Sequence, residues 1–260
     1  MILAVDIGNS TVSLGFYEND RLLRRVKVSS GSERTRDECS MLLRSVSDSF
    51  NLAVGGIEGA VMSSVDPEAA EPWRDAVRDL TGKGPLILTH GVKTGLDIRI
   101  DLHTEVGADI VANMVGAAAR LTPPFAVIDL GTATVISVAG ASGELLGTVI
   151  APGIGISSKA LSASAAALPD VSLTPPVSVI GKNTADSMKS GAILGWASMI
   201  DGLIDRIMDE KEFDRLDLIA CGGYAGRVIP CCKREIPIAE SLTTDGLVRI
   251  YRLNERTGRK

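Results

Sequence analysis

Three aspartates occupy positions at which a carboxylate could take part in chemistry. Asp6 and Asp129 each follow an apolar run and each open an Asp-x-Gly turn, in DIGNST and in DLGTAT. Glycine in such a turn lets backbone N–H groups come close to a phosphate, and the hydroxyl and amide side chains that follow add hydrogen-bond donors. The aspartate can hold a metal ion or a metal-bound water. Asp109 lies at the start of a predicted helix, next to Ile110.

The two Asp-x-Gly turns lie in segments that share one plan. AVDIGNSTVSLGFYENDRLL starts at residue 4 and VIDLGTATVISVAGASGELL starts at residue 127. Each predicts a strand, the glycine turn, a strand, a tight turn and a third strand. The repeat predicts a duplicated fold with a ligand between its halves, in which the two turns grip the phosphates of one nucleotide. Chance similarity between two glycine-turn hairpins is the alternative.

A third glycine turn, Cys221-Gly222-Gly223, follows a predicted strand near the end of the chain. Its backbone is open enough for an adenine or a ribose to pack on it. The chain contains no GxxxxGK[ST] segment, so a Walker loop is excluded. Two Asp-x-Gly turns and a late Gly-Gly turn together predict an ATP-dependent phosphotransferase of the actin-like type.

The elements that must position these turns follow from hydrophobic periodicity and from the glycine and proline positions. Asp66 is expected to cap the helix that begins at Pro67, and Pro123-Pro124 to end the helix before it. Strands are predicted at 1–5, 11–17, 21–28, 59–63, 85–88, 125–128, 135–139, 145–150 and 216–220, and helices at 35–50, 67–80, 108–121, 153–168, 184–208 and 242–254.

Length and composition limit the class of protein. The 260 residues are enough for two modest domains, and 45% of them are hydrophobic. A net charge of −5 argues against a nucleic-acid-binding protein, which needs a basic face. The four cysteines have no CxxC spacing and there are only two histidines, which argues against a zinc site. The N-terminus lacks the pattern of a signal peptide and no apolar run is long enough to span a membrane, so a soluble cytoplasmic protein is expected.

The sequence resembles the type III pantothenate kinases of the actin-like kinase superfamily over nearly its whole length. The segments that carry the resemblance are DIGNST (6–11), KTGLDIR (93–99), EVGAD (105–109), IDLGTAT (128–134), IAPGIGISSKAL (150–161), VIGKNTADSMKSG (179–191), CGGYAGRVIP (221–230) and LTTDGLVRIYRLN (242–254). The resemblance implies an α/β, two-domain actin-like or ribonuclease H-like fold with a duplicated core. We expect its halves at 1–117 and 118–260.

The resemblance also implies a role for individual residues. Asp109 would be the general base that takes the proton of the substrate hydroxyl, and Asp129 would hold the monovalent cation, potassium or ammonium, that the family uses. The implied ATP-binding residues are Asp6, Ile7, Gly8, Asn9, Ser10, Thr11, Val12, Ser13, Thr132, Gly222 and Gly223, and the implied substrate-binding residues are Gly107, Ala108, Asp109, Ile110 and Thr184.

Each of these residues also has a purely structural interpretation. Asp109 could simply favour the positive end of a helix, and Asp6 and Asp129 could be turn formers. Thr184 could be the N-cap of the helix that follows it. Such a capping role can coexist with a functional one.

Two positions depart from the family pattern. The EVGAD motif normally continues with an arginine that binds the pantothenate carboxylate, and here Ile110 follows it. The family usually has a tyrosine, and a proline three positions on, upstream of this motif, where this chain has Ile100 and His103. Losing a charge-assisted pair to a buried carboxylate costs about 2–5 kcal/mol.

The implied activity is phosphorylation of pantothenate to 4′-phosphopantothenate by Mg-ATP, the first step of coenzyme A synthesis, in a homodimer. Three explanations of the departures stay open. Arg99, Lys159 or Lys182 could replace the missing arginine. The chain could phosphorylate a different small alcohol. It could also be a nucleotide-binding paralogue without kinase activity that acts as a regulator or as a partner subunit, forming a heteromer with a second family member.

Overall fold

The computed structural model describes residues 1–31, 33–52 and 54–255, and its chain forms two compact units. Unit 1 consists of Met1–Arg120 together with the chain from Ser241 onwards, and unit 2 is Leu121–Glu240. The sequence predicted that the chain passes once from the first half to the second, near residue 117, and that every later residue belongs to the second half. The structure instead places the last helix in unit 1.

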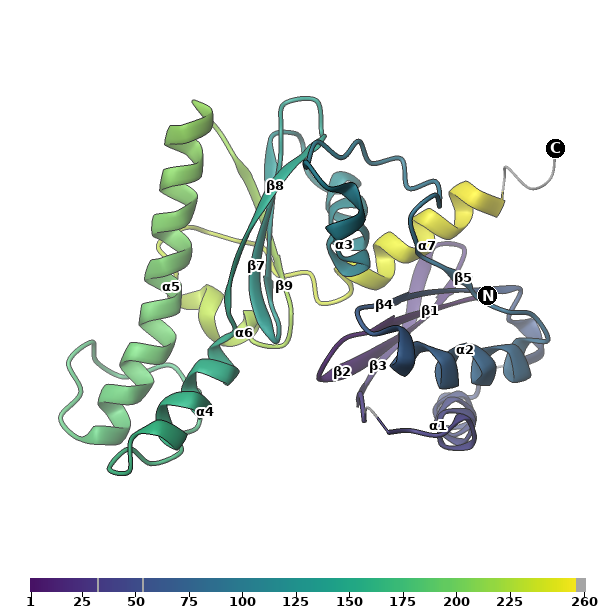
Figure 1. Ribbon diagram of the computed structural model, residues 1–260, viewed down its shortest axis with the longest axis horizontal. Helices are drawn as coiled ribbons and strands as arrows, with labels where there is room; N and C mark the ends of the chain where they lie inside the picture. The colour runs from purple at the N-terminus through teal and green to yellow at the C-terminus, as the bar shows by residue number, and fades with distance from the viewer. Residues whose placement is uncertain (32, 53, 256–260) are drawn as a thin grey trace. The chain divides into compact units, whose positions relative to one another are not determined.

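Unit 1 is built on a five-stranded mixed sheet in the order β3-β2-β1-β4-β5. The strands β1, β2 and β3 form an antiparallel meander, and β4 and β5 continue the sheet parallel to β1. Figure 1 shows α1 and α2 on one face of this sheet and α3 and α7 on the other. The elements are β1 (Ile2–Ile7), β2 (Thr11–Glu18), β3 (Arg21–Ser29), α1 (Arg36–Ser49), β4 (Gly59–Ser64), α2 (Pro67–Thr81), β5 (Leu86–Ile87), α3 (Ala108–Ala118) and α7 (Leu242–Glu255), with short 3₁₀ turns at Val54–Gly56 and His103–Glu105.

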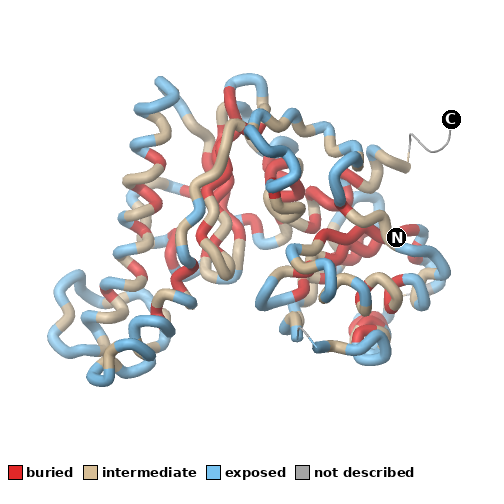
Figure 2. The backbone as a smooth tube through the Cα atoms, viewed as in Figure 1, coloured by how far each residue is buried: buried red, intermediate tan, exposed pale blue. Residues whose placement is uncertain are grey.

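Unit 2 contains a four-stranded sheet in the order β8-β7-β6-β9. Its first three strands are again an antiparallel meander, and β9 pairs with β6 in parallel. Buried residues concentrate along these strands and on the side of α5 that packs on them (Figure 2). The elements are β6 (Phe125–Leu130), β7 (Ala133–Ala139), β8 (Leu145–Pro152), α4 (Ile154–Ser164), α5 (Thr184–Lys211), β9 (Asp217–Cys221) and α6 (Ala225–Val228), with a 3₁₀ turn at Ile229–Cys231.

The two sheets repeat one design, which confirms the predicted duplication of the core. Besides the same order and sense of strands, each meander has a register shift at the same place, between Phe16 and Tyr17 in β2 and between Val138 and Ala139 in β7. Such bulges increase the local twist of a strand. The sequence repeat therefore reflects two copies of the same twisted sheet.

Local signals set most helix boundaries. Thr35 and Glu38 form a reciprocal capping box at the start of α1, and the Asp66 carboxylate accepts the Glu68 N–H at 2.9 Å at the start of α2. Helix α4 is shorter than predicted and ends at Ser164. Near this end the Ser162 hydroxyl donates to the Ser158 carbonyl at 3.2 Å and to the Pro169 carbonyl at 3.1 Å.

Helix α7 is held in unit 1 by an unusually close approach to α3. A Cβ atom on Gly116 would lie 2.5 Å from the Leu242 carbonyl oxygen. One on Gly246 would overlap the Ala112 carbonyl oxygen and lie 3.0 Å from the Gly116 nitrogen. The backbones of the two helices therefore touch where both lack a side chain. The contact brings together two glycines that are far apart in the sequence, Gly116 and Gly246. This close packing holds the returning chain in unit 1.

A single carboxylate ties both ends of the segment that leaves unit 1. The Tyr17 hydroxyl donates to Asp245 Oδ1 at 2.6 Å, and the Ser241 hydroxyl donates to Asp245 Oδ2 at 2.9 Å. The Arg120 guanidinium also pairs with Asp245 Oδ2. Arg120 is the last residue before unit 2 and Ser241 is the first after it. We call these four residues the Asp245 network.

We expect Gly246→Ala to destabilise the protein strongly, because its methyl group has no room against the α3 backbone. Overpacking of this kind costs about 1–3 kcal/mol, and a backbone neighbour gives way less easily than a side chain. Urea denaturation measures the loss. Gly202→Ala in α5 is the matched control, since a Cβ there meets nothing within 4 Å. Equal stability of the two variants would contradict the close contact.

The Asp245 network also predicts a loss of stability at alkaline pH. Burial, and then the hydrogen bond to Asp245, raise the pKa of Tyr17 well above its usual range. Above about pH 10 the unfolded tyrosine loses its proton while the native one keeps it, so the free energy of unfolding falls as pH rises. Between pH 10 and 11 we expect it to fall by up to about 1.4 kcal/mol more in the wild type than in Tyr17→Phe. Parallel curves for the two proteins would refute this.

Candidate functional site

The Asp6 turn (residues 6–11) is held in place by its neighbours in unit 1, and the polar side chains of residues 9–11 are exposed to solvent. The Gly8 N–H donates to the Thr11 carbonyl at 3.0 Å. Ser63 on β4 donates its hydroxyl to Asp6 Oδ1 at 2.8 Å, so the half-buried carboxylate is held by the adjacent parallel strand. Residues 9–11, which carry one amide and two hydroxyl groups, are exposed. The turn thus presents hydrogen-bond donors from a fixed backbone, as a phosphate site requires.

The Asp129 turn (residues 129–132) is held in unit 2 by two backbone hydrogen bonds. Gly153 donates its N–H to the Thr132 carbonyl at 3.1 Å, and Tyr224 donates its N–H to the Leu130 carbonyl at 3.0 Å. The Asp129 and Thr132 side chains are half-buried. The turn is therefore braced by the start of α4 and by the segment that follows β9.

The Asp129 turn lies against two glycines, and it fits there because they have no side chains. A Cβ on Gly153 would overlap the Thr132 carbonyl oxygen and lie 2.7 Å from the Gly131 carbonyl oxygen. A Cβ on Gly222 would lie 2.6 Å from Asp129 Oδ1 and 2.5 Å from the Leu130 carbonyl carbon, and Gly222 also has a φ of 94°. Gly222 was predicted to bind ATP. In the structure it lies directly against the Asp129 carboxylate. Sequence reasoning missed Gly153, although its position in the APGIG segment was a usable signal.

The two Asp-x-Gly turns are not equal in length, which the sequence alignment did not show. Ile7 pairs with Val12, so residues 8–11 form the first turn. Leu130 pairs with Thr134, so residues 131–133 form the second turn. The second turn is one residue shorter and offers fewer exposed donors. The turns can therefore play different parts, with more hydrogen-bond donors in the first and a held carboxylate in the second.

Asp109 is the second residue of α3, and backbone features hold its carboxylate. Its Oδ1 accepts the Ile110 N–H at 2.9 Å, and Gly107 lies so close beneath it that a Cβ there would overlap Oδ1. The carboxylate thus satisfies one of the free N–H groups at the helix start. It is half-buried, as are Gly107, Ala108 and Ile110. The structural role leaves the carboxylate accessible for a chemical one.

The structural interpretation of Thr184 as the N-cap of α5 is wrong. Asn183 is the cap, because its side-chain oxygen accepts the Asp186 N–H at 2.9 Å. Thr184 is exposed and lines a mostly apolar hollow of about 370 Å³ between α4 and α5, with Leu161, Met188 and Trp196 among its other walls. The hydroxyl of Thr184 therefore does not cap the helix.

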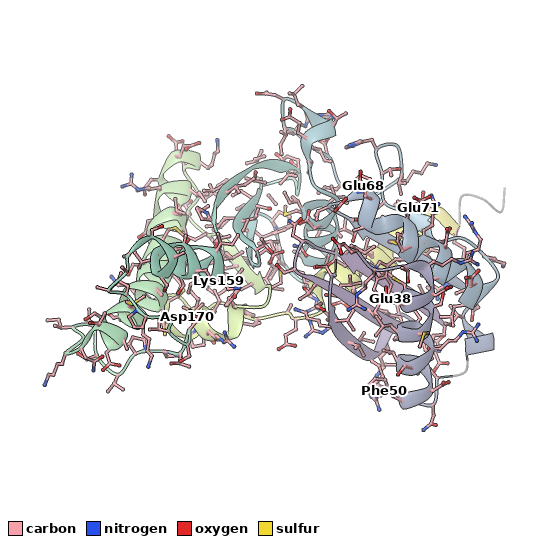
Figure 3. The ribbon with its side chains drawn as sticks, turned by 60° about the horizontal axis from the view of Figure 1, so that its bottom comes forward. Glu38, Phe50, Glu68, Glu71, Lys159 and Asp170 are labelled. Atoms are coloured by element: carbon pink, nitrogen blue, oxygen red, sulfur yellow. The ribbon has the colours of Figure 1, made fainter. Side chains whose placement is uncertain are left out.

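The structure also places the cations that could replace the missing arginine. Arg99 is exposed and pairs with Asp97 at 2.8 Å. Lys159 is exposed on α4 (Figure 3), and Lys182 is exposed in the loop before α5. Lys159 and Lys182 belong to unit 2, whereas Ile100 and Ile110 belong to unit 1.

The predicted site residues are divided between the two units. Unit 1 holds residues 6–13 and 107–110, and unit 2 holds Asp129, Thr132, Thr184 and Gly222-Gly223. Within residues 1–31, 33–52 and 54–255, no group of three or more His, Cys, Asp or Glu side chains could hold a metal ion. In that part of the chain no helix is long and apolar enough to cross a membrane. The cation site at Asp129 stays a prediction.

Comparison with known proteins shows which family the sequence matches. Residues 2–206 match the family model described as type III pantothenate kinase. A type III pantothenate kinase of Shouchella clausii is 40% identical over 256 residues, covering 98% of this chain and 100% of its own length. One from Thermobifida fusca is 37% identical over 257 residues, with 98% and 100% coverage.

Solved structures show the fold at lower identity. A putative Baf family transcriptional activator from Campylobacter jejuni is 17% identical with a TM-score of 0.59, covering 98% of this chain and 99% of that one. MreB 5 of Spiroplasma citri bound to AMPPNP is 12% identical with a TM-score of 0.54, covering 99% and 96%. The two-domain α/β fold of the actin-like type is thereby confirmed.

We expect Gly153→Ala to displace the Asp129 turn, because the new methyl group would meet the carbonyl oxygens of Gly131 and Thr132. The variant should lose about 1–3 kcal/mol of unfolding free energy, and its crystal structure should show the turn moved. Gly147→Ala on β8 is the control, since a Cβ there meets nothing within 4 Å. An unmoved turn in Gly153→Ala would show that the glycine is not required.

Proposed function

The chain belongs to the type III pantothenate kinase family, and we propose that it transfers the terminal phosphoryl group of ATP to the hydroxyl of pantothenate, giving 4′-phosphopantothenate for coenzyme A synthesis. The observation that carries this proposal is a 40% identity that extends over 98% of the chain and all of the relative. The described residues include candidates for the phosphate turns and for the general base, whereas Ile110 stands where an arginine for the substrate carboxylate was expected. Both phosphate turns and the helix-start carboxylate lie in the matched segments.

The Asp6 turn suits the phosphates of ATP. Its exposed hydroxyls and amide can donate to phosphate oxygens, while Ser63 keeps the Asp6 carboxylate oriented for a magnesium ion or its bound water. Magnesium supplies charge neutralisation for the phosphates when it is bound. In unit 2, the Asp129 carboxylate would hold a monovalent cation, potassium or ammonium. The Thr132 hydroxyl would contact ATP.

Asp109 is the proposed general base. In the transfer, the substrate oxygen forms a bond to the terminal phosphorus, the bond from that phosphorus to the bridging oxygen of ADP breaks, and the hydroxyl proton passes to Asp109. A carboxylate is a weak base, but phosphoryl transfer depends mainly on positioning and charge stabilisation. The Ile110 N–H and the space above Gly107 fix the carboxylate.

Ile110 supports a second candidate function, phosphorylation of a less anionic alcohol. Its side chain is half-buried in the first turn of α3, beside the proposed base. An apolar group there cannot pair with a substrate carboxylate. Lys159, Lys182 or a second subunit of a homodimer could supply that pairing, which would leave pantothenate as the substrate. A paralogue that binds nucleotide without turnover, alone or in a heteromer, is the remaining alternative.

A product assay with two substrates tests these functions together. The purified protein is mixed with Mg-ATP, potassium and either pantothenate or panthenol, the analogue in which a hydroxymethyl group replaces the carboxylate, and products are identified by mass spectrometry. We expect phosphopantothenate, with a rate about 10²–10⁴-fold lower in Asp109→Asn. Asp101→Asn, an exposed aspartate upstream, is the control.

Each outcome of this assay separates the candidates. A preference for panthenol would move the proposal to an uncharged alcohol. Nucleotide binding without product from either substrate would sink the kinase proposal and favour the partner-subunit alternative. Full activity in Asp109→Asn would remove Asp109 from the role of base.

A further inference from the structure

Unit 1 contains a hollow of about 470 Å³ that none of the proposed kinase residues lines. One wall is formed by β2 and the turn after it, through Tyr17, Asp20 and Leu22. The other wall is formed by Arg120 and by α7, and the α7 residues at positions 245, 248, 249, 252 and 253 follow the spacing of one helix face. The hollow is therefore a built feature of two elements that pack on each other.

The charges that face the hollow do not cancel. Three arginines and two aspartates line it, in a chain whose net charge is −5. Asp245 is fully engaged by the donors of the Asp245 network, including Arg120. Arg252 pairs with Asp20 at 3.1 Å and with Glu255 at 3.0 Å. Glu255 lies outside the lining, so among the lining residues alone one positive charge is left without an ion pair.

That charge belongs to Arg249. Its side chain is exposed at the hollow and has no hydrogen bond or ion pair to any residue in 1–31, 33–52 or 54–255. Its planar guanidinium can donate two parallel hydrogen bonds to a carboxylate. One uncompensated guanidinium matches one negative charge, which favours a carboxylate over a doubly charged phosphate.

Besides these charged residues and the hydroxyl groups of Tyr17 and Ser241, the lining contains three apolar residues. Leu22 and Leu253 supply hydrocarbon surface on the two walls, Val248 between them is buried, and Leu253 is 39% exposed although it is a large apolar residue. Pockets for small molecules combine such surface with a few polar groups that fix orientation. A ligand that covered Leu253 would gain from removing this surface from water.

We propose that this hollow binds a small organic carboxylate with a short apolar chain. The carboxylate pairs with Arg249, and the chain lies over Leu22 and Leu253. The site is separate from the proposed ATP and substrate residues, so the proposal does not depend on the kinase function.

Hexanoate is the probe that tests this site, because it has one carboxylate and a short chain but no hydroxyl to phosphorylate. We expect saturable binding to the full-length protein, with a dissociation constant of about 1 mM as befits a ligand of this size. Ligand-observed NMR titration measures it. 1-Hexanol, which has the same chain without the charge, should bind at least about tenfold more weakly.

Two variants locate the binding. Arg249→Gln should weaken hexanoate binding at least about tenfold, while Arg44→Gln, an equal charge change on the exposed face of α1, should leave it unchanged. Arg249→Lys keeps the charge and should bind with intermediate strength, which guards against loss of folding in the glutamine variant. Absence of binding up to tens of millimolar, equal binding of hexanol, or an equal effect of both glutamine variants would overturn the proposal.

Discussion

The close contact between α3 and α7 is the constraint on which unit 1 depends. The chain leaves this unit after Arg120 and must come back with a helix that fits onto α3, which only paired glycines at 116 and 246 allow. The Asp245 network then ties the outgoing and returning segments to β2. Because α3 carries Asp109 in its first turn, the helix that bears the proposed base is fixed by the last element of the chain.

Unit 2 uses glycine in the same way around the Asp129 turn. Gly153 and Gly222 are needed for the space they leave, and their neighbours are backbone atoms and a carboxylate oxygen that cannot move aside easily. The result is a turn held by two backbone hydrogen bonds and enclosed from two directions. Rigidity of this kind suits phosphoryl transfer, because that reaction depends on where charges and donors are placed.

The sequence predicts the parts of the fold that local chemistry decides. Both meanders and the Asp66 cap follow from period-two alternation and from a side chain that bonds within three residues. It could not predict that α7 belongs with unit 1, because the match of Gly116 and Gly246 is visible only in three dimensions. The shorter second turn was also hidden, since strand pairing decides turn length and the aligned letters suggest equal turns.

The isoleucine beside the proposed base changes less of the site than its chemistry suggests. The Asp109 carboxylate is positioned by the backbone N–H of residue 110 and by the missing side chain of Gly107. Neither feature depends on which side chain residue 110 carries. Under the proposed function we therefore expect a substitution at this position to change what the substrate pairs with, while the carboxylate keeps its place at the helix start. Under the proposed function, an arginine here would offer about 2–5 kcal/mol of pairing to a substrate carboxylate, so its absence would affect the choice of substrate and not the placement of the base.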